Sequence, residues 1–218
     1  MAILAWDETG KKIYETGTKK GVLYLKDITG AYSNGVAWNG LTGVTESPSG
    51  AEESPFYADD IKYLALRSVE EYAATIEAYT YPKEFEACNG EAEVVPGVVI
   101  GQQKRSTFGM AYSTIIGNDV DLDDHGYKLH IIYGATVPPS EKAYASVNDS
   151  PEPVTFSFEI STTPVAVTGH KPTASITIDS TLVDATKLKA LEDILYGTAD
   201  VEPRLPLPDE IATLMKAA

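Results

Sequence analysis

The stretch that decides the fold is VTFSFEIS, residues Val154–Ser161, in which apolar and polar residues alternate without interruption. Side chains on a β-strand point to opposite faces in turn, so this pattern gives one strand an apolar face and a wet face. The apolar face consists of Val154, Phe156, Phe158 and Ile160. The same alternation recurs in Thr173–Ser180 and Tyr127–Tyr133. The sequence therefore predicts three half-buried strands.

Further strands are expected where aromatic and β-branched residues cluster between turn-forming Gly, Asn and Asp residues. Three weaker candidates fit this description: Gly21–Lys26, Gly35–Leu41 and Thr107–Ile116. Several short strands with turn signals between them are typical of antiparallel sandwiches and barrels. We therefore expect a mainly β protein, an antiparallel β sandwich or barrel, in which residues 1–218 form one domain.

Two helices are expected towards the C-terminus. The first begins after Asp184, a candidate N-cap, and stops at Gly197. Its apolar stripe contains Leu188, Leu191, Ile194 and Leu195. A short terminal helix is expected to open at Pro208, because the fixed φ of proline suits the first helical position and acidic residues follow in the first turn. The first helix should flank the sheet.

Three segments are interpreted as arms or loops: residues 1–20, 44–60 and 198–218. Val44–Asp60 is rich in Ser, Pro and Gly, and Pro203–Pro208 has proline at three of its six positions. We expect neither segment to build a core alone. Ile61–Tyr81 fits both an apolar helical stripe and a strand alternation, and propensity alone favours the helix.

The composition excludes several classes of function. Seventeen Lys and Arg residues against 32 Asp and Glu residues give a net charge of −15, which disfavours tight nucleic-acid binding. Cys88 is the only cysteine, so an intrachain disulfide and a cysteine-based zinc cage are excluded, and we interpret it as a half-buried free thiol. The first residues lack the apolar run of a signal peptide, so we expect synthesis in a cytosol-like compartment.

The polar cluster from Asn118 to His125 is the best candidate for a metal site, and it fails as one. An EF-hand register beginning at Asp121 places Ile132 where the bidentate Glu must lie. A solvated hairpin turn explains these residues better. We interpret His130 as a surface imidazole on the wet face of its strand. The sequence also lacks the nucleophile-elbow, phosphate-loop and dinucleotide motifs, so we expect no catalytic, cofactor-binding or metal-binding residues.

Several longer phrases of the sequence resemble the major tail proteins of bacteriophages with long, flexible, non-contractile tails. The phrases are AATIEAYTYPKEF (Ala73–Phe85), PGVVIGQQ (Pro96–Gln103), GYKLHIIYG (Gly126–Gly134), NDSPEPVTFSFEISTTP (Asn148–Pro164) and TIDSTLV (Thr177–Val183). The resemblance runs from near Gly21 to Gly197 and transfers no catalytic motif.

This resemblance implies a phage tail-tube fold, in which a β sandwich or barrel with a flanking helix forms six-membered rings that stack into a hollow tube for viral DNA. The implied partners are further copies of the chain together with the tape measure, tail tip and terminator proteins. DNA would pass through unbound, and the subunit would be made in the bacterial host cytoplasm and end in the virion tail. Such folds pair two strands where Ile61–Tyr81 is ambiguous, which implies a hairpin of Lys62–Arg67 with Tyr72–Tyr81 around Ser68–Glu71, and a short helix near Pro82–Cys88.

The long loop is the candidate for contacts between subunits. Pro55, Phe56 and Tyr57 place apolar groups in Val44–Asp60, where no core is evident, which indicates a partner surface or a loop folded back on its own sheet. Two other classes of function remain open. One is a different virion structural protein, such as a tail terminator or a capsid-decorating protein, and the other is a carbohydrate-binding β sandwich.

Overall fold

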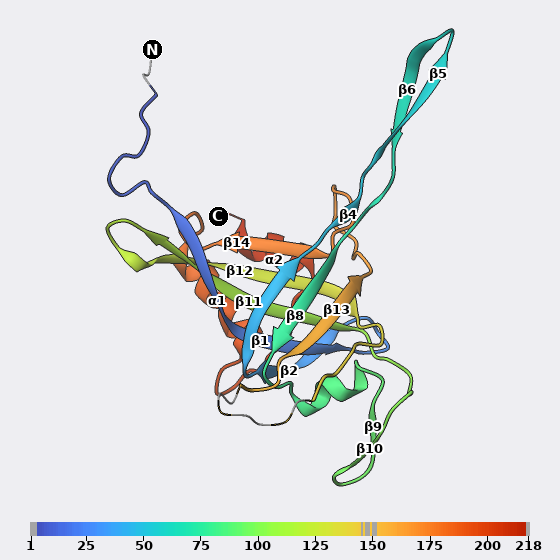
Figure 1. Ribbon diagram of the computed structural model, residues 1–218. Helices are drawn as coiled ribbons and strands as arrows, with labels where there is room; N and C mark the ends of the chain where they lie inside the picture. The colour runs from blue at the N-terminus through green and yellow to red at the C-terminus, as the bar shows by residue number, and fades with distance from the viewer. Residues whose placement is uncertain (1–3, 145, 147–148, 150–151, 217–218) are drawn as a thin grey trace.

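The computed structural model describes residues 4–144, 146, 149 and 152–216. The fold is mainly β and antiparallel, with two short α-helices and one 3-10 helix (Figure 1). Its strands are β1 (Tyr14–Lys26), β2 (Tyr32–Trp38), β3 (Leu41–Glu46), β4 (Ser49–Gly50), β5 (Glu53–Ala58), β6 (Ile61–Arg67), β7 (Glu70–Glu71), β8 (Ala73–Ala78), β9 (Ala92–Val95), β10 (Val98–Ile100), β11 (Phe108–Asn118), β12 (Leu122–Thr136), β13 (Phe156–Thr162) and β14 (Ser175–Asp179). Its helices are η1 (Lys83–Ala87), α1 (Ala185–Tyr196) and α2 (Pro208–Met215).

The main sheet has eight strands in the order β2-β1-β11-β12-β13-β8-β3, with β14 paired to β12 beside this path. The long strand β12 connects the two parts of the sheet. Its residues Lys128–Ile132 pair with β14, whereas only Ala135 and Thr136 pair with β13. The sheet therefore changes direction along β12 and folds over on itself, so that β13, β8 and β3 cross in front of β11 and β12 (Figure 1).

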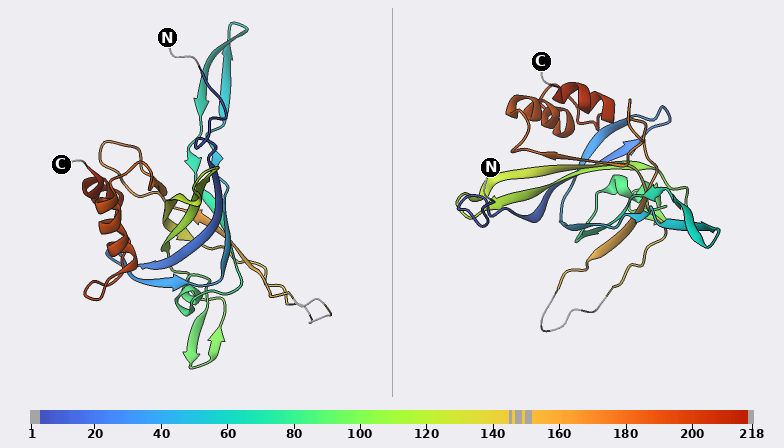
Figure 2. Two further views of the ribbon diagram at one scale, coloured as in Figure 1. Left: turned by 90° about the vertical axis from the view of Figure 1, so that its left-hand side faces the viewer. Right: turned by 90° about the horizontal axis from the view of Figure 1, so that it is seen from above.

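Two hydrophobic clusters lie on opposite faces of β11 and β12. The first fills the space under β3, β8 and β13 and is rich in aromatic rings, with Phe85 packed between Trp38 and Phe158 at centroid distances of 4.6 and 4.8 Å. The second lies under α1 and α2, which cover one outer face of the sheet (Figure 2). This arrangement is consistent with a β sandwich with a flanking helix, as the sequence predicts.

The three strands predicted by alternation are confirmed. Val154–Ser161 corresponds to β13, in which Phe158 and Ile160 are buried, and the other two stretches correspond to β14 and to part of β12. The prediction that one face of β12 is exposed to solvent is wrong. Ile132 is 1% exposed and His130 is largely covered, because the first cluster packs on the face opposite to Leu129 and Ile131.

The weaker strand predictions are confirmed with shifted boundaries. Gly21–Lys26 is the second half of the longer β1, and Thr107–Ile116 corresponds to β11. Gly35–Leu41 spans the end of β2 and the start of β3, with a turn at Asn39 and Gly40 between them.

Both predicted helices are confirmed. The Asp184 side chain accepts hydrogen bonds from the backbone N–H groups of Thr186 and Lys187, which satisfies donors that the first turn leaves open. Gly197 ends α1 with φ of 78°, a conformation that glycine adopts without strain. Pro208 lies in the first turn of α2, followed by Asp209 and Glu210.

The interpretation of residues 198–218 as an arm that builds no core is wrong for its central part. Leu205 is 2% exposed, and its N–H donates to the carbonyl of Tyr32 at the sheet edge. The Tyr133 hydroxyl donates to the Pro206 carbonyl at 2.7 Å. Prolines keep this segment extended, so it runs along the edge of β2 and α2 can then lie on the sheet. The expected N-terminal arm, residues 1–20, likewise becomes strand β1 from Tyr14 onwards.

The strand interpretation of Ile61–Tyr81 is confirmed, but the predicted pairing is wrong. Lys62–Arg67 lies in β6, which pairs with β5. Ala73–Ala78 forms β8, which pairs with β3 on one side and with β13 on the other. The predicted short helix near Pro82–Cys88 is the 3-10 helix η1.

Candidate assembly surfaces

The arm hairpin, which we define as β5 and β6 with the turn between them, extends away from the body of the molecule (Figure 1). The turn residues Asp59 and Asp60 have φ of 50° and 62°. Two consecutive residues with positive φ form the tight turn whose twist matches paired strands. The prediction of Val44–Asp60 as a loop is therefore wrong. The segment contains the second half of β3, then β4 and β5, and its end forms the turn into β6.

The arm hairpin has one charged face and one apolar face. Residues directly opposite each other in an antiparallel pair share a face. On one face Glu53 lies opposite Arg67 and forms ion pairs with Arg67 and Lys62. On the other face Phe56 lies opposite Leu64, Ser54 opposite Leu66, and Ala58 opposite Ile61.

The apolar face of the arm hairpin has no cover within the described part of the chain. Phe56, Ile61, Leu64 and Leu66 expose between 40% and 65% of their surface. A two-stranded hairpin is marginally stable in water unless another element covers its apolar face. Exposed apolar residues gathered on one face also mark interaction surfaces. This face is therefore the strongest candidate for contact with another molecule.

The structure divides the three residues that the sequence proposed for contacts. Phe56 belongs to the apolar face of the arm hairpin, whereas Pro55 and Tyr57 lie on the charged face. Tyr57 is 69% exposed. The residues that sequence reasoning missed are Ile61, Leu64 and Leu66, because a bulge after Phe56 leaves Tyr63 without an opposite residue and breaks the alternation along β6.

The root of the arm hairpin is the short pair β4–β7. Gly50 has φ of 84°, and a Cβ at this position would lie 2.3 Å from the Val69 carbonyl oxygen. Only glycine allows the two backbone segments to approach so closely here. Below it, the Ser47 N–H donates to the Ala73 carbonyl at 2.8 Å. The arm hairpin is thus connected to β3 and β8 by paired backbone.

A polar cluster lies in the body next to this root. Its members are Glu46 at the end of β3, Tyr72 between β7 and β8, Tyr112 on β11 and His130 on β12. Burial and the neighbouring Glu46 carboxylate raise the pKa of both tyrosine hydroxyls. The His130 ring stacks on Tyr112 at 4.7 Å, and burial lowers the pKa of its imidazole. The interpretation of His130 as a surface imidazole is therefore wrong.

The short hairpin, β9 and β10, is a second amphipathic projection. Val95 lies opposite Val98 and Ala92 opposite Ile100, which makes one face apolar. On the other face Val99 lies opposite Glu93, whose carboxylate pairs with Lys83. This hairpin was not predicted from the sequence, although the Pro-Gly pair between two Val-Val pairs in VVPGVVI is typical of a tight turn between strands.

Within the Asn118–His125 cluster, Asp119–Asp121 form the predicted hairpin turn, and the other residues lie at the adjoining ends of β11 and β12. The Asn118 side chain organises it, accepting from the Val120 N–H at 2.9 Å and donating to Asp121 Oδ2 at 2.9 Å. Hydrogen bonds from Asn118 and His125 lower the pKa of the Asp121 carboxyl. Among the described residues, no group of three or more His, Cys, Asp or Glu side chains is arranged to hold a metal ion.

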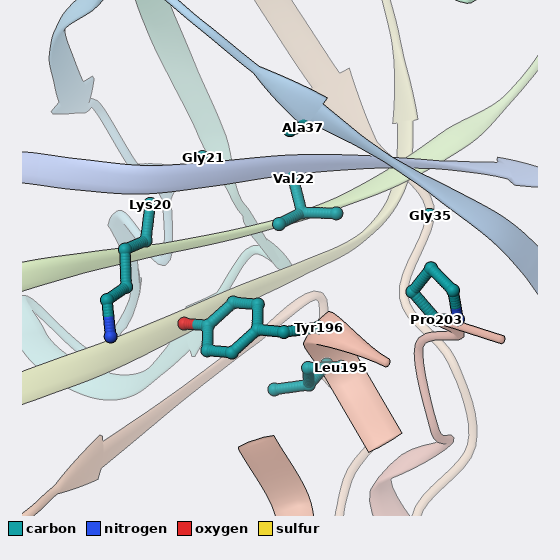
Figure 3. Close-up of a pocket in the computed structure, with 8 residues that line it drawn as sticks. All are labelled: Lys20, Gly21, Val22, Gly35, Ala37, Leu195, Tyr196 and Pro203. Carbon is teal, nitrogen blue, oxygen red and sulfur yellow. The ribbon is translucent and has the colours of Figure 1, made fainter. Parts of the chain in front are cut away.

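A groove of about 490 Å³ lies between β1, β2 and the C-terminal end of α1 (Figure 3). Its walls are mostly apolar, and the Lys20 ammonium lies 5.4 Å from the centre of the Tyr196 ring. The eight lining residues are Lys20, Gly21, Val22, Gly35, Ala37, Leu195, Tyr196 and Pro203. These eight include no carboxylate and no imidazole.

Within the described ranges, no helix combines the length and apolar character needed to cross a membrane. No protein-family model matches this chain, and no curated protein matches it either.

Proposed function

We propose that this protein is the tail-tube subunit of a bacteriophage with a long, non-contractile tail. In this proposal six copies form a ring, rings stack into a hollow tube, and viral DNA passes along the bore without binding. The subunit is made in the host cytoplasm and joins the tape measure, tail tip and terminator proteins in the tail.

The observation that carries this proposal is the arm hairpin with its uncovered apolar face. A monomer gains nothing by holding four large apolar side chains in water at the end of a projecting ribbon. Phe56 and Leu64 have no role in either core cluster. A protein that assembles with its own copies gives such a face a partner at every repeat.

Two further properties support a structural role. The described residues form a sandwich with a helix on one face, which is the architecture that the resemblance implies. The net charge of −15 supports a bore that repels DNA, because phosphate binding depends on Lys and Arg groups that release counterions. In this proposal the function of the bore is to let DNA pass without adhesion.

Electron microscopy of the purified protein, from dilute to concentrated solution, tests the proposal. We expect hollow tubes with a regular axial repeat and six subunits per ring in cross-section. Solid fibres, or a protein that stays monomeric at the highest concentration reached, would contradict it. Adding capsids distinguishes the tail-tube proposal from a capsid-decorating function, because a decorating protein would coat the capsids and form no tubes.

A further inference from the structure

The two amphipathic hairpins lie at opposite ends of the molecule. In Figure 1 the arm hairpin extends from the upper end and the short hairpin from the lower end. A quarter turn about the vertical axis keeps them at these two ends (Figure 2). A projection at one end and a second projection at the other suit a contact that repeats in one direction.

We propose that the apolar face of the arm hairpin docks on the apolar face of the short hairpin of a second copy of this chain. The inference rests on the proposed function, because it names the two surfaces through which stacked copies meet. It goes further in giving the stack a direction, with the arm hairpin of one copy reaching the lower end of the next.

The two faces match in character. Each hairpin places an ion pair on one side: Glu53 with Lys62 within the arm hairpin, and Glu93 of the short hairpin with Lys83 of η1. Each leaves valine, isoleucine, leucine or phenylalanine side chains on the other side. The apolar side chains of the short hairpin are 52–53% exposed at Val95 and Val98 and 43% exposed at Ile100. Docking removes both apolar faces from water at once.

A basic side chain follows the short hairpin in the sequence, and the tip of the arm hairpin is acidic. The tip carries Asp59 and Asp60, both exposed. Glu93 of the short hairpin is paired with Lys83, and the sequence from Val94 to Asn118 has no acidic residue and carries the exposed Lys104. An acidic tip that approaches this segment is attracted, whereas the same tip is repelled by most of a surface with net charge −15.

The size of the contact explains why a ring is needed. Half-exposed side chains on two such faces bury roughly 600 Å² together, well below the roughly 1,200–2,000 Å² of a stable pairwise interface. One contact between two monomers is therefore weak. Six contacts around a ring act together, and their combined affinity greatly exceeds that of one. The contact thus favours growth on an existing ring over premature association of monomers.

Two variants that each disable one surface test this pairing by complementation. Ile61→Thr/Leu64→Thr makes the arm face polar, and Val95→Thr/Val98→Thr does the same for the short hairpin. Threonine retains strand propensity, so both hairpins should persist. Each variant alone is expected to lose stacking. Mixed together they should form two-layer particles, because the first variant keeps an intact short hairpin and the second keeps an intact arm.

Matched controls lie on the charged faces of the same hairpins. Tyr57→Thr and Val99→Thr remove exposed apolar groups without touching the proposed contact, and both should stack like the wild type. Circular dichroism and thermal melting should be unchanged in all variants, since these residues belong to neither core cluster.

The outcomes separate this inference from the proposed function. Wild-type tubes together with normal stacking of Val95→Thr/Val98→Thr would overturn the inference and leave the tube proposal standing. A mixture that remains unassembled while the wild type stacks would overturn it too. Two-layer particles from a protein whose wild type makes solid fibres would support the inference and reject the tube. A wild type that never associates contradicts both.

Discussion

The Tyr112 hydroxyl donates a hydrogen bond to Glu46 Oε1 at 3.0 Å, which connects the last residue of β3 to the centre of β11. The same carboxylate oxygen lies 3.7 Å from His130 Nδ1, and Thr114 Oγ1 lies 2.9 Å from His130 Nε2. This network holds the chain just before it leaves the body to form the arm hairpin. Its protonation state therefore affects the part of the sheet that supports the arm.

We expect the stability of the protein to fall as the pH decreases through the region just below 6.5, and His130 to be one cause. Burial lowers the pKa of His130, opposed by Glu46 and Glu15 and assisted by Lys128. The unfolded chain then binds a proton at a pH where the folded chain does not, so acid favours unfolding. In the His130→Gln variant this part of the pH dependence should be absent.

Thermal melting of both proteins between about pH 5 and 7.5 checks this expectation. The difference in melting temperature between wild type and variant should change with pH in this window. Carboxyl groups with lowered pKa, such as Asp121 and Glu210, lose their contribution at lower pH and provide the common background. Parallel melting profiles for the two proteins would show that His130 is not responsible.

Leu205→Ala should destabilise the protein by about 2–5 kcal/mol, the usual cost of removing a buried leucine side chain. Leu205 is 2% exposed and belongs to the cluster under α1 and α2. Leu207, two residues further along, is 44% exposed, and Leu207→Ala should change stability by less than about 0.5 kcal/mol. Urea unfolding of both variants measures the contrast. If Leu205→Ala changed the free energy of unfolding as little as Leu207→Ala, this segment would contribute no packing.

The sequence was most informative for elements that are determined by residues within the element itself. VTFSFEIS, the Asp184 N-cap and the Gly197 stop each depend on residues within one element, and all three agree with the structure. The packing of the C-terminal segment against the body was not predicted. Leu205 is surrounded by prolines, and its burial depends on β2, a strand that lies far away in the sequence.

The candidate site was harder to predict than the fold. Because Pro55 and the serines before it are typical of loops, the composition predicts a loop where the structure has β5. Proline is nevertheless tolerated in a ribbon with free edges. The bulge at Tyr63 then hides the alternation of β6. Pairing between β5 and β6 depends on a turn of two aspartates with positive φ, which is less characteristic than Asn-Gly. Only the aromatic residues in the segment indicated a partner surface.

Cys88 should resist alkylation in the folded protein at pH 8. The side chain is buried, and burial raises the pKa of its thiol to about 12, so the reactive thiolate is scarce and inaccessible. We expect a maleimide reagent to label it only when urea unfolds the chain, with the labelling midpoint at the unfolding transition. Rapid labelling of the native protein would instead reveal local opening around η1. The expectation of a half-buried thiol is thus corrected to a buried one.

Replacing Glu52–Ser68 by two glycines should remove the stacking of rings and leave the body folded. The backbone makes this cut possible, because the Ala51 N–H lies 3.5 Å from the Val69 carbonyl oxygen. Deleting only Ser47–Tyr57 is a poorer test, since it removes β5 and leaves β6 unpaired with its apolar side chains exposed.

The deletion variant should melt within about 4 °C of the wild type, which corresponds to roughly 1 kcal/mol or less for a chain of this size. No residue between Glu52 and Ser68 belongs to either core cluster, so neither core loses a contact. Electron microscopy should then show rings or monomers without stacks. Stacks formed by the deletion variant at normal concentration would place the axial contact elsewhere, and an unfolded variant would show that the arm hairpin supports β3 and β8.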